Sequence, residues 1–149
     1  MQHIKLSLFA ILFVLTGCAN FTNENSLQAL NAWDKTYNEC FEQSTDSTFL
    51  FPTDKWYDAL PIKDKQQVTL YLYQLKMYQC WGQDAADLKQ ALTRDNNESL
   101  IKLFTGLGVF NKPDGELIKN IDKKQVNRFE KTINVFDLRK VAIQQKFRK

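Results

Sequence analysis

The sequence predicts a mainly α-helical protein, a small single-domain bundle of about four to five helices. Three observations lead to this prediction. Apolar side chains recur at steps of three and four residues in residues 27–41 and again in residues 126–136, a spacing that places them on one face of a helix. Between these stretches, residues 62–81 contain neither proline nor glycine. Finally, 149 residues of which 44% are apolar suffice for one domain with a hydrophobic core.

The first helix is predicted over residues 26–44. Asn25 or Ser26 can cap its N-terminus, because short polar side chains accept hydrogen bonds from the free N–H groups of a first turn. The polar run 44–48 ends the helix. Its apolar face consists of Leu27, Leu30, Trp33, Tyr37, Cys40 and Phe41.

A short helix and then a long one follow an aromatic connector. Thr53 or Asp54 can cap the short helix, which has to end before Pro61. Pro61 suits the first turn of the long helix, which we expect Gly82 to close. This helix is apolar nearly all round, as is typical of the central helix of a bundle. A strand over residues 68–72 is the competing interpretation, but the length of the apolar stretch favours a helix.

Two shorter helices come next. Asp84 can cap a third helix, which the pair Asn96-Asn97 ends. The same pair can cap a short helix around residues 100–104. Gly106 and Gly108 then end this segment.

The last helix is predicted to begin at Asp122, after a turn at residues 111–115. Asp122 and Gln125 have the spacing of a capping box. Apolar side chains repeat at helical spacing as far as Phe136, and then shift to a neighbouring stripe. We therefore expect the end of this helix to face solvent or a partner. The shifted stripe consists of Leu138, Val141, Ile143 and Phe147.

Charge is distributed unevenly along the chain, although its net value is only +3. Residues 18–111 hold 8 basic and 12 acidic side chains, a net charge of −4. Residues 112–149 hold 11 basic and 5 acidic side chains, a net charge of +6. The favoured interpretation of the basic segment is a solvated helix face. The alternatives are contacts with anionic lipid, an acidic partner or nucleic acid.

The N-terminal residues have the pattern of a secretory signal. Lys5 precedes residues 6–15, which are apolar apart from one serine. This stretch is too short to cross a bilayer as a helix but long enough for the core of a signal peptide. Its end, Leu15-Thr16-Gly17-Cys18, resembles the lipobox of bacterial lipoproteins. The resemblance, which covers only residues 1–18, implies cleavage before Cys18 and acylation of that cysteine. The alternative is an ordinary signal peptide with a chance cysteine.

This resemblance implies a division of the chain into a signal peptide (1–17), a lipidated tether (18–25) and one helical domain (26–149). Two or three acyl chains would anchor the protein almost permanently in membrane lipid. Ala19 after the cysteine, in place of aspartate, implies the periplasmic face of the outer membrane. Anchoring to the inner membrane, or to the cell membrane of a Gram-positive host, is the alternative. In the periplasm we do not expect nucleic acid as a partner.

Two cysteines remain after Cys18. In an oxidising envelope compartment, Cys40 and Cys80 are expected to form a disulfide. The alternative is two buried thiols that behave as small apolar side chains. Because Cys40 lies near the end of the first predicted helix and Cys80 near the end of the long one, the bond would require parallel or steeply crossed helices. The connector of residues 44–61 would then run back along the domain.

The side-chain inventory argues against catalysis. The only histidine, His3, belongs to the predicted signal peptide, so the mature chain would lack imidazole for triads, zinc ligation or proton transfer. We expect no metal and no cofactor, and predict that the protein is not an enzyme. Paired carboxylates are the remaining possibility, namely Asp84 with Asp87 and Asp54 with Asp58. Acidic residues in first helical turns are, however, expected from capping alone.

The predicted function is a non-catalytic binding or assembly module with an envelope protein as its partner. An adaptor, a pilotin-like protein or an inhibitor of the immunity type fits by analogy of location and architecture. The alternative is a cell-wall-active or glycan-binding protein with paired carboxylates and exposed aromatic side chains. Candidate partner-binding residues are Trp56 and Tyr57, and on the C-terminal helix Leu138, Arg139, Lys140, Val141 and Phe147. Other aromatic candidates, which at helical spacing are more often core, are Trp33, Tyr37, Tyr71, Tyr73, Tyr78 and Trp81.

Overall fold

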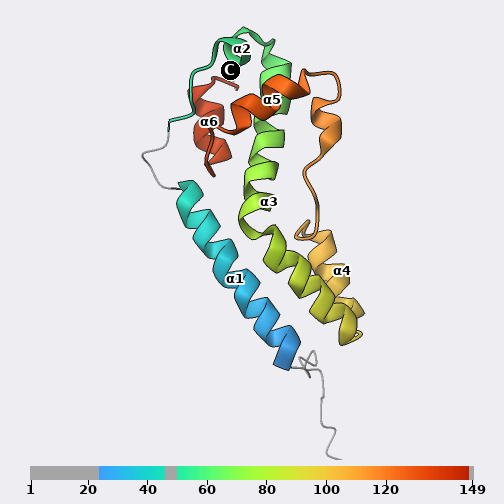
Figure 1. Ribbon diagram of the computed structural model, residues 1–149. Coiled ribbons are helices and arrows are strands. Elements are labelled where there is room, and N and C mark those ends of the chain that lie inside the picture. Colours follow the sequence, from blue (N-terminus) through green and yellow to red (C-terminus); the bar gives the residue numbers. More distant parts are fainter. Residues whose placement is uncertain (1–23, 46–49, 148–149) are drawn as a thin grey trace, which may run out of the picture.

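The computed structural model describes residues 24–45 and 50–147. Over these residues it contains six α-helices, one 3-10 helix and no β-strand, so the prediction of a mainly α-helical bundle is confirmed. Five of the α-helices have seven or more residues. The elements are α1 (Glu24–Thr45), α2 (Lys55–Ala59), α3 (Ile62–Arg94), α4 (Glu98–Gly106), η1 (Gly115–Ile118), α5 (Lys123–Glu130) and α6 (Leu138–Gln144) (Figure 1).

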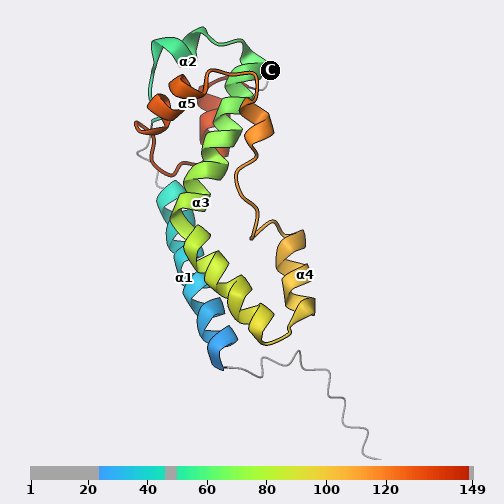
Figure 2. The same ribbon diagram turned by 45° about the vertical axis from the view of Figure 1, so that its right-hand side comes forward.

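The 33-residue helix α3 forms the axis of the molecule. Helices α1 and α4 flank its C-terminal half, and the remaining elements surround its N-terminal half (Figures 1 and 2). The prediction that Gly82 ends this helix is wrong, and the helix expected after Asp84 is the second half of α3. One interior glycine costs only about 1 kcal/mol relative to alanine. Burial of Ala85 and Leu88, which follow Gly82 in α3, stabilises the continuous helix and offsets this cost in free energy.

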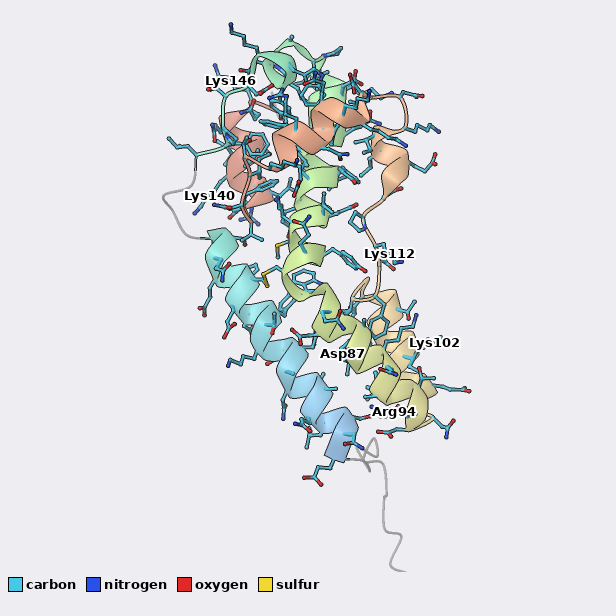
Figure 3. All side chains as sticks on the ribbon, in the orientation of Figure 1. Asp87, Arg94, Lys102, Lys112, Lys140 and Lys146 are labelled. Carbon is cyan, nitrogen blue, oxygen red and sulfur yellow. A yellow bond between two sulfur atoms is a disulfide. The ribbon has the colours of Figure 1, made fainter. Side chains whose placement is uncertain are left out.

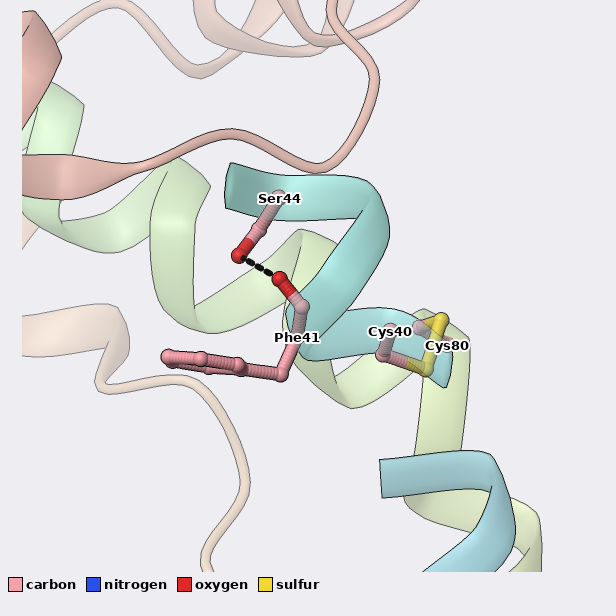
Figure 4. The surroundings of a disulfide bond; sticks show 4 residues. All are labelled: Cys40, Phe41, Ser44 and Cys80. Carbon is pink, nitrogen blue, oxygen red and sulfur yellow. Dashed lines mark hydrogen bonds between the residues drawn. A yellow bond between two sulfur atoms is a disulfide. The ribbon is translucent and has the colours of Figure 1, made fainter. Parts of the chain in front are cut away.

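Helix α1 packs antiparallel to α3. The Ser26 hydroxyl at the start of α1 donates to the Asp95 carboxylate at the end of α3. The predicted disulfide is confirmed: it joins Cys40, near the C-terminal end of α1, to Cys80 of α3, and their Cα atoms are 6.1 Å apart (Figure 4). The expected parallel or crossed arrangement is therefore wrong. It assumed that Cys80 lay near a helix end, whereas α3 continues to Arg94.

The described part of the connector, residues 50–61, lies at the N-terminal end of α3 and does not run back along α1 (Figure 1). Ser26, a predicted cap, is a buried residue inside α1. At the other end of α1, the Ser44 hydroxyl donates to the Phe41 carbonyl at 2.7 Å (Figure 4). The first helix is thus predicted to within about two residues, but its direction relative to α3 is not.

Two hydrophobic clusters lie along α3. The larger one surrounds its N-terminal half, where the rings of Phe51, Tyr57 and Phe129 pack against one another with centroids 4.9–5.6 Å apart. The smaller one joins Leu88 and Leu92 of α3 to α4 and α1. Its other members include Phe104, Leu30, Trp33, Leu100, Ile101 and Phe110.

The C-terminal region contains two helices where one was predicted. Asp122 caps α5 as expected, accepting from the Lys124 and Gln125 N–H groups at 2.9 and 3.3 Å. The Gln125 side chain does not complete a capping box, because it accepts from Arg128 Nε. Helix α5 ends at Glu130, before a segment rich in β-branched residues, which are weak helix formers. Asp137 then caps α6 through the N–H groups of its first turn.

Asp54 links two parts of the larger cluster. Its Oδ1 accepts from the Trp56 and Tyr57 N–H groups at 2.9 and 3.1 Å, which confirms its predicted capping of α2. Its carboxylate also forms a two-pronged ion pair with Arg128 of α5, with N–O distances of 2.8 and 3.0 Å. The Arg128 guanidinium, with help from the backbone N–H groups, lowers the pKa of Asp54 from 3.8 to about 2.

Substitution of Asp54 separates these two roles. Asp54→Asn keeps a good cap and loses the ion pair, and we expect it to cost about 0.5–1 kcal/mol at pH 7. Asp54→Ala loses both and should cost roughly 1–2 kcal/mol more. Because the folded-state pKa is lowered, the ion pair stabilises above about pH 4 and its contribution fades as the pH falls towards 2. Urea unfolding at several pH values checks this. A difference between wild type and Asp54→Asn that persists at pH 2 would contradict it.

Candidate functional site

A groove of about 800 Å³ lies between the middle of α3 and residues 108–115. The chain that joins α4 to η1 runs alongside α3 (Figure 1). This volume is within the roughly 300–1,000 Å³ range of ligand-binding clefts. The groove combines aromatic and polar side chains. On α3 it is lined by Tyr73, Gln74, Met77, Tyr78 and Trp81, and on the opposite side by Gly108, Phe110, Asn111, Lys112, Pro113, Asp114 and Gly115.

The wall opposite α3 is fixed at both ends. At one end, Gly108 adopts a left-handed conformation (φ +76°), which glycine tolerates without strain, and its carbonyl accepts from the Asn111 N–H at 3.1 Å. Phe110 packs against Phe104 of the smaller cluster, with ring centroids 6.1 Å apart. At the other end, the Asp114 N–H donates to Gln74 Oε1 of α3 at 2.8 Å. The groove is therefore preformed.

The aromatic side chains on α3 are supported from behind. The Trp81 ring lies 4.8 Å from the Tyr37 ring of α1, next to the disulfide at Cys80. The Tyr73 ring lies 5.9 Å from that of Phe136, and burial raises the pKa of Tyr73. These contacts hold the rings in place, so ligand binding would require little ordering of side chains.

Gly82 makes room for Tyr78. A Cβ atom added at Gly82 would lie only 3.1 Å from two carbon atoms of the Tyr78 ring. The Tyr78 ring therefore packs against Gly82, one turn further along the helix. Gly82, predicted to end a helix, instead shapes one side of the groove.

The charges at the groove are few. Lys112 lines the groove and is exposed (Figure 3), and Asp114 is the only carboxylate among the described lining residues. Asp114 Oδ1 already accepts from the Glu116 N–H at 3.0 Å, as the cap of η1. Among the residues that the structure describes, no group of three or more His, Cys, Asp or Glu side chains could hold a metal ion. The groove is suited to contact and hydrogen bonding more than to acid–base chemistry.

The predicted pair Trp56-Tyr57 does not form an exposed surface. Tyr57 is 0% exposed, and its hydroxyl pairs with that of Thr69 at 2.7 Å. Burial raises its pKa to about 12. Trp56 is half-buried and packs against Phe129, with ring centroids 6.2 Å apart. Tyr57 therefore cannot be the partner-binding residue that the sequence suggested, because its ring is buried against Phe129 of α5.

The predicted C-terminal surface is present only in part. Val141 is 2% exposed and belongs to the larger cluster, so it cannot contact a partner. Leu138 and Phe147 are half-buried, whereas Arg139 and Lys140 are exposed. The side of α6 that faces solvent thus includes the predicted Arg139 and Lys140 but not Val141.

Neither of the two predicted carboxylate pairs lines the groove. Asp54 is a cap and ion-pair partner, and Asp58 Oδ2 accepts from the Asp54 N–H at 3.2 Å. Asp84 and Asp87 line a separate, smaller hollow of about 290 Å³ that also includes Arg94. Cys18 lies outside the described residues. None of the described helices is long and apolar enough to cross a membrane.

Tyr73, Tyr78 and Trp81 are recognisable from the sequence as aromatic candidates. The groove is not, because its second wall depends on the distant contact between Gln74 and Asp114. The fold and the groove together define a disulfide-bonded, mainly helical protein with an aromatic groove beside its central helix. Comparison with protein-family models, curated proteins and solved structures finds no match to this chain.

Proposed function

We propose that this protein is a lipid-anchored, non-catalytic binding module of the bacterial envelope that receives a segment of a partner protein in its aromatic groove. The observation that carries the proposal is the preformed groove, lined by Tyr73, Tyr78, Trp81 and Phe110. Aromatic side chains supported from behind, with polar groups at the rim, are typical of the energetically dominant centres of protein interfaces. The anchor would be acylated Cys18, at the periplasmic face of the outer membrane.

The groove chemistry favours binding over hydrolysis. Glycoside hydrolysis needs two carboxyl groups about 5–9.5 Å apart across the scissile bond. Asp114 is the only acidic residue among the described residues that line the groove, and its carboxylate caps η1. A glycan ligand is the competing occupant, and incubation with purified peptidoglycan tests it. Binding or cleavage of glycan strands in the groove would show that the ligand is a glycan and not a partner protein.

Photocrosslinking in intact cells tests the proposal directly. A photoreactive amino acid at Asn111, exposed on the groove rim, should form one predominant adduct with a single envelope protein. The same amino acid at Asn38, exposed on α1 and absent from the groove lining, is the matched control and should not form that adduct. Equal adducts from both positions, or none from Asn111, would contradict the proposal.

Two glycine variants provide a sharper comparison. Gly82→Ala should shift the Tyr78 ring by a few tenths of an ångström from its place in the groove wall and lower the affinity for the captured partner by roughly threefold to tenfold, as expected for a disturbed interface centre. Gly106→Ala adds the same methyl group where no atom lies within 4 Å, and should leave the affinity unchanged. Titration of the purified variants with the partner measures this. Equal affinities for both would show that the Tyr78 side of the groove makes no contact.

A further inference from the structure

A second surface, separate from the groove, lies on α6. The solvent-facing side of this helix lines a hollow of about 760 Å³. Leu138, Ala142 and Ile143 form its apolar part, and Ile143 is 72% exposed. Arg139 and Lys146 flank these side chains. A side chain as apolar and as exposed as Ile143 gains free energy when another apolar phase covers it.

The opposite side of α6 is firmly attached to the domain. Val141 is buried in the larger cluster. The Gln144 side chain pairs with both backbone groups of Phe51, each at 3.0 Å. The Phe147 carbonyl accepts from Gln66 Nε2 at 3.3 Å. Helix α6 therefore presents its basic and apolar side to solvent as a fixed surface.

The charges on this surface are of one sign. Among the described residues, 138–147 contain three basic side chains, Arg139, Lys140 and Lys146, and no acidic side chain. Asp137, the nearest acidic residue in the sequence, turns its carboxylate to the N–H groups of Arg139 and Lys140 as the cap of α6. Figure 3 shows Lys140 and Lys146 on the same side of the molecule. A basic helix with exposed apolar side chains is typical of a membrane-surface contact.

We propose that the α6 surface, defined by Leu138, Arg139, Lys140, Ile143 and Lys146, binds the anionic headgroups of membrane phospholipids and inserts Ile143 among their acyl chains. Cations contribute attraction to an anionic surface one by one, and the apolar side chains add burial in the interfacial region. The complementarity of charge therefore selects anionic over zwitterionic lipid.

The position of α6 implies an orientation, and this part rests on the proposed anchor at Cys18. Lys140 Nζ donates to the Thr45 carbonyl at 2.6 Å, so α6 lies beside the C-terminal end of α1. The anchor would precede the other end of α1, which is about 33 Å away for 22 residues at ~1.5 Å each. Residues 18–23 can span at most about 21 Å at ~3.5 Å each, so both contacts can reach one bilayer only if α1 is inclined towards the membrane plane and does not stand upright on it.

Vesicle sedimentation with the mature chain carrying Cys18→Ser, which has no acylation site, tests the lipid contact without the anchor. This protein should bind phosphatidylglycerol vesicles and not phosphatidylcholine vesicles, and 0.5 M salt should weaken the binding because charges are then screened within about 4 Å. Arg139→Gln, Lys140→Gln and Lys146→Gln together should lower partitioning by at least about tenfold. Ile143→Asn should lower it at unchanged charge.

The control is a second triple variant with the same change in net charge, Lys63→Gln, Lys102→Gln and Lys123→Gln, at exposed positions elsewhere. It should keep most of the binding. Equal losses in the two triple variants would overturn the proposal, because net charge and not the α6 surface would be responsible. Absence of any preference for phosphatidylglycerol would overturn it as well. Neither result bears on the groove, whose partner is measured separately.

Discussion

Removal of the disulfide by Cys40→Ala together with Cys80→Ala should lower the free energy of unfolding by about 3–4 kcal/mol. The bond closes a loop between residues 40 positions apart in the sequence, and the chain-entropy model assigns a loop of this length nearly 4 kcal/mol. It also joins α1 to the middle of α3, close to the Tyr37–Trp81 contact behind the groove. Urea unfolding monitored by far-ultraviolet circular dichroism measures the loss.

A reducing agent provides the control for this experiment. Wild-type protein in dithiothreitol should unfold at the same urea concentration as the double variant, while the variant itself should be unaffected by the reductant. A double variant within about 1 kcal/mol of the oxidised wild type would show that packing between α1 and α3 suffices without the bond.

Phe129→Ala should be the most destabilising single substitution in the larger cluster, at about 3–5 kcal/mol. Its ring is fully buried and lies 4.9 Å from the Tyr57 ring and 5.6 Å from the Phe51 ring. Truncation would leave a cavity between α2, α3 and α5. The same measurement of urea unfolding checks the value.

Phe41→Ala is the matched control, since it removes the same atoms from a side chain that is 50% exposed on α1. It should change the free energy of unfolding by no more than about 0.5–1 kcal/mol. Similar losses for the two variants would contradict the position of Phe129 in the core. Tyr57→Ala should also be strongly destabilising, because Tyr57 is buried in the same cluster as Phe129. A loss of partner binding in a Trp56→Ala, Tyr57→Ala double variant would therefore report unfolding and not a lost contact with the partner.

Local features of the fold were predictable because they depend on neighbours in the sequence. The cap at Asp54, the cap at Asn97 and the start of α5 at Asp122 each follow from one short polar side chain before a helical pattern. The disulfide followed from the presence of two cysteines, Cys40 and Cys80, in an expected oxidising compartment.

Features that depend on tertiary contacts were not predictable. Gly82 has the appearance of a helix end, and only packing on both sides of it keeps α3 continuous. That one difference also reverses the inferred direction of α1, since it places Cys80 within the helix. Ile133 and Phe136 are buried as the helical spacing suggests, but they reach the core from a loop. The groove likewise depends on Asp114 meeting Gln74 across 40 residues.

The proposed function depends first on the location of the chain, which the sequence predicts from Leu15-Thr16-Gly17-Cys18. The most direct test is the intact mass of the protein purified from the membrane fraction of cells that produce the full chain. We expect a chain that begins at Cys18 and carries a diacylglyceryl group, with or without a further amide-linked acyl chain. A chain that keeps residues 1–17, or one cleaved elsewhere without an acyl group, would contradict it.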